Sequence, residues 1–148
     1  MKVYLDACCI NRPFDDQTQD RVRLEAEAVL IVIRHFENHE WTWYGSDILD
    51  FELNQIPDIE RRQKTRQLIR FLHSIIEING DIVGRAIDLE KLGFKAYDAL
   101  HLACAEEANV DVLLTTDERF LRLGYRFKDQ IKVKLSNPLS WINERTIQ

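Results

Sequence analysis

Short runs of β-prone residues alternate along this chain with longer segments of helical periodicity. The predicted strands are residues 2–6, 41–44, 110–116 and 132–136. The predicted helices are residues 19–38, 46–55, 58–72, 81–92, 97–108, 118–123 and 139–145, and a brief apolar run, SIIEI, occupies residues 74–78. Alternating strands and helices predict an α/β fold, a three-layer α/β/α sandwich with a mainly parallel central sheet.

Several residues mark where these elements begin and end. Ser46 is suited to cap the helix that follows it, and Gly93 is suited to a left-handed conformation after the helix 81–92. The stretch from Ala7 to Asp16 contains Asn, Pro and paired Asp residues, so it is predicted to be a polar loop. In the helix 19–38, the apolar residues recur at helical spacing, and Glu25 is interpreted as one of the charged residues outside this stripe.

The chain has 148 residues, with 45% hydrophobic and 30% charged residues, which is a usual composition for a single globular domain. No repeat or linker divides it, so one domain is predicted over residues 1–148. Its longest apolar run, Ala28–Ile33, is too short to cross a membrane, and no secretory signal follows Met1. Three cysteines without metal-site spacing are expected to be reduced, in a cytoplasmic protein.

Four acidic residues occupy positions that the predicted fold would bring together. Asp6 and Asp117 follow predicted strands, and parallel sheets bind ligands at the carboxyl ends of their strands. Glu52 lies within the apolar stripe of its helix, and Asp98 begins a helix rich in Ala and Leu. Carboxylates drawn close repel one another unless some are protonated or a cation lies among them, so the pattern predicts a divalent-metal site.

Each acid also has a simpler structural explanation. Asp6 can belong to a turn, Asp98 can interact with free N–H groups at a helix start, and Asp117 can cap the next helix. Asp50 lies close to Glu52 in sequence, but Glu52 is favoured because it lies on the apolar face. His101 is interpreted as a packing histidine with hydrogen bonds, since Mg²⁺ and Mn²⁺ prefer oxygen ligands.

In its sequence contexts, YLDACCINRP, SDILDFELNQ, YDALHLACAE and LLTTDERFL, this set of acids resembles the PIN-domain ribonucleases, including the VapC-like toxins. The resemblance covers nearly the whole chain. It implies that Asp6, Asp98 and Asp117 coordinate Mg²⁺ or Mn²⁺ and that Glu52 is a fourth catalytic acid acting through metal-bound water. It also implies an RNA substrate, an antitoxin partner if the protein is a toxin, and a homodimer.

The same resemblance assigns supporting polar positions to Asn11 and Thr116. It departs from the family at Ala7-Cys8-Cys9, where relatives often carry hydroxyl residues. The net charge of -5 gives no general attraction for nucleic acid, so RNA would need local cations near the acids. Arg12 is the predicted substrate-binding cation. The basic residues of the helix 58–72 either assist it or form an ordinary solvated helix face.

Other classes of enzyme fit the sequence less well. A haloacid-dehalogenase-like phosphatase needs a second acid two residues after the first, where this chain has Cys8. A receiver domain needs an acidic pair near the first strand, and dinucleotide binding needs a G-x-G-x-x-G motif; the chain has neither. The remaining alternative is a PIN-like protein-binding module that keeps the acids but is catalytically silent.

Overall fold

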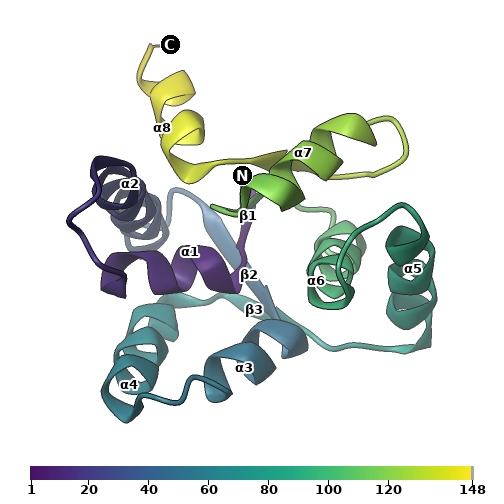
Figure 1. The fold of residues 1–148 in the computed structure, drawn as a ribbon, viewed down its shortest axis with the longest axis horizontal. Helices are drawn as coiled ribbons and strands as arrows, with labels where there is room; N and C mark the ends of the chain where they lie inside the picture. Colours follow the sequence, from purple (N-terminus) through teal and green to yellow (C-terminus); the bar gives the residue numbers. More distant parts are fainter. Residues whose placement is uncertain (148) are drawn as a thin grey trace.

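The computed structural model describes residues 1–147, and a five-stranded sheet lies at its centre (Figure 1). All strands pair in parallel in the order β3-β2-β1-β4-β5. Their bounds are β1 Lys2–Leu5, β2 Thr42–Ser46, β3 Ser74–Ile76, β4 Val112–Leu114 and β5 Lys134–Ser136. Strands β2 and β3 lie on one side of β1, and β4 and β5 lie on the other. The carboxyl ends of β1 and β4 are therefore at the point where the strand order switches sides.

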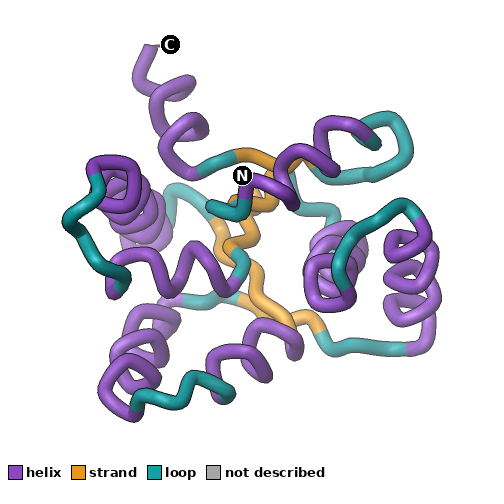
Figure 2. Tube along the Cα trace, in the orientation of Figure 1, coloured by secondary structure: helices purple, strands orange, loops and turns teal. Residues whose placement is uncertain are grey.

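Helices cover both faces of the sheet, and the ribbon and the tube show the three layers (Figure 1 and Figure 2). The helices are α1 Ala7–Asn11, α2 Asp20–Glu37, α3 Asp47–Asn54, α4 Ile59–Leu68, α5 Gly80–Lys91, α6 Ala96–Glu107, α7 Glu118–Arg126 and α8 Pro138–Ile147. Helices α2, α4 and α8 lie on one side, with α5 and α6 on the other. The predicted α/β/α sandwich with a parallel sheet is confirmed.

Each face of the sheet has its own hydrophobic core because successive strand residues point to opposite sides. Val3 and Leu5 of β1 pack with α2, α3 and α8, whereas Tyr4 between them packs with α5, α6 and α7. Trp43 of β2 is fully buried in the first of these cores. The alternation along β1 therefore places the Tyr4 side chain on the same face of the sheet as α6.

The predicted polar loop after Asp6 is wrong. Residues 7–11 form α1, and Arg12–Phe14 form a short 3-10 helix. The helix starts at once because the Asp6 carboxylate accepts a hydrogen bond from the Cys9 amide, at 3.1 Å. The predicted helix 58–72 is also shorter, ending at Leu68 before a 3-10 turn over Ile69–Phe71, and the apolar run SIIEI contains β3.

Other local predictions are confirmed. The Ser46 hydroxyl accepts a hydrogen bond from the Leu49 amide, and Gly93 has a φ of 112°. In the described part of the chain, none of the helices has both the length and the apolar character needed to cross a membrane. The single domain predicted for residues 1–148 stays a prediction, and its last residue lies outside the described residues.

Candidate metal centre

Asp6 and Asp117 lie after neighbouring parallel strands and each caps the helix that follows. Asp6 is only 2% exposed. Asp117 accepts hydrogen bonds from the Arg119 and Phe120 amides, at 2.9 and 3.2 Å. Thr115 joins the two acids, because its hydroxyl accepts from the Asp117 amide at 3.1 Å and bonds to the Asp6 carboxylate. The capping role and a role in a site are therefore compatible in both residues.

Glu52 and Asp98 come from two helices, α3 and α6, that pack against each other. The Glu52 carboxylate is 24% exposed, and its Oε1 forms a hydrogen bond with Nε2 of buried His101. This bond explains how a carboxylate can lie on an apolar helix face. Asp50, the alternative acid on α3, turns away and pairs with Arg66 at 2.5 Å. The structure thus places Glu52, and not Asp50, toward α6.

The four acids interact electrostatically with one another. Burial and the charges of Asp6, Asp117 and Glu52 together raise the pKa of Asp98 to about 6, against the opposing effect of His101. Burial also raises the pKa of Asp6, against the opposing effects of His101, Thr115 and the Cys9 amide. The acids from four distant segments are therefore close enough for their charges to act on Asp98, and their convergence on one metal ion stays a prediction.

The Cys8 thiol reports the same convergence from a different position. Its pKa is raised chiefly by the charge of Asp6, then by burial, and then by the other three acids. The charges of all four acids therefore act on the Cys8 thiol. Cys8 is free and exposed by surface area, whereas Cys9 and Cys104 are free and buried.

An open cleft of about 450 Å³ is lined by two of the four acids, Glu52 and Asp117. Its lining comes from the segment after β1, from α3 and from the segment after β4, and consists of Ala7, Cys8, Asn11, Arg12, Asp15, Glu52, Thr116 and Asp117. The predicted supporting residues Asn11 and Thr116 both line it. Thr115 and Thr116, which precede Asp117, are both buried, at 0% and 5% exposure.

The donor chemistry of this centre suits a divalent cation. Within residues 1–147, no three His, Cys, Asp or Glu side chains already stand in an arrangement that could hold a metal ion. The raised pKa values of Asp6 and Asp98 show that burial and mutual repulsion both disfavour their charged forms. A cation among the carboxylates would relieve both effects, and oxygen ligands are those that Mg²⁺ and Mn²⁺ prefer.

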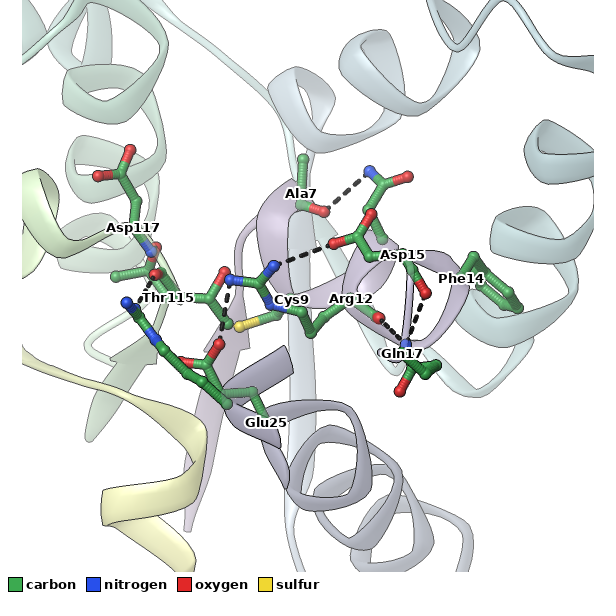
Figure 3. A network of polar contacts seen from close by, with 12 residues as sticks. Ala7, Cys9, Arg12, Phe14, Asp15, Gln17, Glu25, Thr115 and Asp117 are labelled. Carbon is green, nitrogen blue, oxygen red and sulfur yellow. Dashed lines mark hydrogen bonds and ion pairs between the residues drawn. The ribbon is translucent and has the colours of Figure 1, made fainter. Parts of the chain in front are cut away.

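A buried carboxylate that the sequence analysis did not single out supports the rim of the cleft. Glu25 of α2 is 1% exposed and pairs with Arg12 at 3.0 Å and with Arg21 at 3.4 Å. Figure 3 shows the Arg12 guanidinium between the carboxylates of Glu25 and Asp15. The interpretation of Glu25 as an exposed residue is wrong. Its spacing of three and four residues from Val22 and Val29 places it on the apolar stripe.

The Glu25 network connects segments that are distant in the sequence. Arg21 also donates to the Thr116 carbonyl at 3.3 Å, next to Asp117, and the Asn137 amide donates to Glu25. Arg61 of α4 reaches Asp15 at 2.9 Å and also contacts Asn11. The other basic side chains of α4 have partners too: Arg62 donates to the Ile56 carbonyl, Lys64 pairs with Glu60, and Arg66 pairs with Asp50 of α3.

The fold and the cleft define an α/β protein that gathers acidic side chains at the carboxyl ends of parallel strands. The sequence model of the PIN domain family matches residues 3–124, which include all four acids, so the chain belongs to the PIN domain family. Members of this family are typically nucleases and generally use divalent metal ions. The predicted resemblance is therefore confirmed.

A solved structure shows the same fold. It is a chain in the crystal structure of VapBC2 from Rickettsia felis, bound to a DNA fragment from the promoter of that pair. The two chains superpose with a TM-score of 0.58 at 19% sequence identity, and the match covers 93% of this chain and 98% of the other. A search of curated proteins found no match to this chain.

Proposed function

We propose that this protein is a metal-dependent endoribonuclease that cuts RNA phosphodiester bonds at the acidic cleft. The observation that carries the proposal is the cleft that Glu52, Asp117 and Arg12 line together, with Asp6 and Asp98 close enough for their charges to act on Cys8 of the same cleft. Asp6, Asp98 and Asp117 would hold Mg²⁺ or Mn²⁺. When bound, such an ion lowers the pKa of a water molecule and balances negative charge on the attacked phosphate.

In this proposal, other residues of the cleft accept a proton, bind the substrate phosphate and support the cleft wall. Glu52 accepts the proton that the attacking water loses, since its carboxylate lines the cleft and has one oxygen bonded to His101. Arg12 faces the cleft while Asp15 and Glu25 hold its guanidinium, so it provides a fixed positive charge for a substrate phosphate. Asn11 and Thr116 support the wall of the cleft.

Single-stranded or looped RNA is the proposed substrate because its backbone and bases are accessible. The fold shared with a VapBC2 chain supports a role as the toxin of a toxin–antitoxin pair in the cytoplasm. Its antitoxin would place a basic side chain among the acids, which would neutralise them as a metal ion does. A homodimer is proposed from the family resemblance alone.

The first test is the metal dependence of cleavage. We expect the protein to cut single-stranded RNA with Mg²⁺ or Mn²⁺, to lose this activity in EDTA, and to regain it when the metal is restored. Glu52→Gln should lower the rate about 10- to 100-fold, as expected for loss of a general base. Products are measured on denaturing gels with end-labelled RNA.

The matched control is Glu107→Gln, which makes the same chemical change at an exposed position of the neighbouring helix α6. This variant should cut RNA at the wild-type rate. Cleavage that persists in EDTA, or equal cleavage by Glu52→Gln and the control, would contradict the nuclease assignment. Binding of an antitoxin without RNA cleavage would instead favour the silent binding module.

A further inference from the structure

A chain of buried hydrogen bonds ends at Glu52. The Ser46 hydroxyl and the Tyr4 hydroxyl are 2.6 Å apart, and the Tyr4 hydroxyl is 2.6 Å from Nδ1 of His101. Nε2 of His101 then contacts Glu52 Oε1. The three residues that lead to Glu52 through these hydrogen bonds, hereafter the Ser46–Tyr4–His101 chain, are each at most 1% exposed. They come from β2, β1 and α6, so the chain crosses the core below the cleft.

The direction of these hydrogen bonds follows from the groups at the two ends. A carboxylate oxygen can only accept, so Nε2 of His101 donates to Glu52. In the neutral imidazole, Nδ1 is then the acceptor, and it accepts a hydrogen bond from the Tyr4 hydroxyl. Tyr4 in turn accepts from Ser46, whose oxygen accepts from the Leu49 amide at 3.3 Å. Every group in the chain thus has a partner of the correct polarity.

We infer that His101 is a positioning residue for Glu52, and that Tyr4 and Ser46 hold His101 in the ring orientation and tautomer that this task requires. The inference rests on the proposed nuclease function. The bond fixes Oε1 of Glu52, and no partner for Oε2 is found in the part of the chain that the structure describes. Oε2 is therefore the oxygen available to the proposed attacking water, and the bond between Oε1 and His101 fixes its position.

The alternative role for this chain is structural, since a buried tyrosine and histidine need hydrogen-bond partners in any case. Two features favour the positioning role. The chain of hydrogen bonds ends on a residue that lines the cleft, and an apolar side chain at position 101 would remove both the acceptor of the Tyr4 hydroxyl and the N–H donor to Glu52. Partners that orient a catalytic group through hydrogen bonds change activity about 10- to 100-fold when removed.

The test is Tyr4→Phe, which keeps the buried ring and removes only the hydroxyl that selects the tautomer. We expect kcat for single-stranded RNA to fall about 10-fold while KM changes less than about twofold, since Tyr4 does not reach the substrate. The stability control is Ile33→Val, a mild core change on the opposite face of the sheet, expected to cost about 1 kcal/mol. This control should leave kcat unchanged.

A double-mutant cycle with Glu52→Gln separates positioning from general loosening. If the chain acts through Glu52, Tyr4→Phe should have no further effect on kcat once Glu52 is already Gln. An equal loss in both backgrounds would overturn the inference. Wild-type cleavage with an unaltered kcat in Tyr4→Phe would also overturn it while leaving the nuclease proposal intact, whereas an inactive wild type would remove the nuclease proposal itself.

Two substitutions at His101 give a second test that does not depend on the folding of Tyr4→Phe. Both His101→Gln and His101→Leu lose the bond to Tyr4, but only Gln keeps an N–H donor that can reach Glu52. We expect Gln to retain most of the wild-type kcat and Leu to lose about 10- to 100-fold. Equal kcat values for these two variants, measured at equal folded fractions by circular dichroism, would contradict the positioning role.

Discussion

Replacing Asp98 with Asn is expected to lower RNA cleavage at least about 100-fold, which corresponds to about 2.7 kcal/mol of activation free energy. The same change should make the metal-free protein more stable at pH 7.5. Both effects have one cause, because Asp98 carries a charge that burial and three neighbouring acids disfavour. An amide of the same shape removes that charge and also removes a ligand suited to a divalent ion.

The pH dependence of stability has a definite sign. In the metal-free fold, the pKa of Asp98 is about 6, above its ordinary value of 3.8, so between these values the folded state binds more protons than the unfolded state. Stability is therefore greatest below about pH 4 for this group and is lost as the pH rises through 6. Asp98 is partly in contact with water, which screens its charge. We therefore expect the free energy of unfolding to change by about 1 kcal/mol, less than the whole pKa shift would give.

Thermal unfolding measures these effects directly. At pH 7.5 without metal, Asp98→Asn should melt about 2–4 °C above wild type, and the difference should shrink at pH 5. Saturating Mn²⁺ should raise the melting temperature of wild type but not that of the variant. The matched control is Asp88→Asn on α5, where the exposed carboxylate pairs with Lys91 at 3.7 Å. A metal-free Asp98→Asn protein less stable than wild type would contradict this account of the acidic centre.

The parts of the site that follow from regular structure could be predicted from the sequence. Asp6 and Asp117 end strands, and parallel strands deliver their carboxyl ends to one edge of the sheet. Helical spacing identified Glu52 as an acid on an apolar face, and the structure supplies the His101 donor that this position needs. These inferences depend only on the periods of strands and helices, which the sequence records directly.

The parts that depend on contacts between distant segments could not be predicted. The helix α1 begins inside a stretch of turn-forming residues because the side chain of Asp6 caps it, and residues of this type favour both turns and caps. Nothing in the local sequence indicates that Tyr4 meets His101, which lies 97 residues later. Glu25 is different, since its spacing from Val22 and Val29 alone places it on the apolar stripe of α2.

Glu25→Ala is expected to destabilise the fold by about 3 kcal/mol, the lower end of the range for breaking a buried ion pair by removing one partner. Glu25 is 1% exposed, and its loss would leave the largely buried guanidinium of Arg12 with Asp15 alone. Asn137, before α8, would lose the acceptor of its amide as well. Urea unfolding followed by tryptophan fluorescence and circular dichroism measures the change in free energy.

Two comparisons separate the buried pair from a simple loss of charge. Glu27→Ala removes an exposed carboxylate two residues further along the same helix and should change the free energy of unfolding by less than about 0.5 kcal/mol. Arg12→Met combined with Glu25→Leu removes both partners, and should recover part of the loss because no buried charge is left unpaired. If Glu25→Ala and Glu27→Ala had equal effects, the network would not stabilise the fold. The Arg12 side chain would then owe its position to Asp15, and the proposed alignment of Arg12 toward a substrate phosphate would not require Glu25.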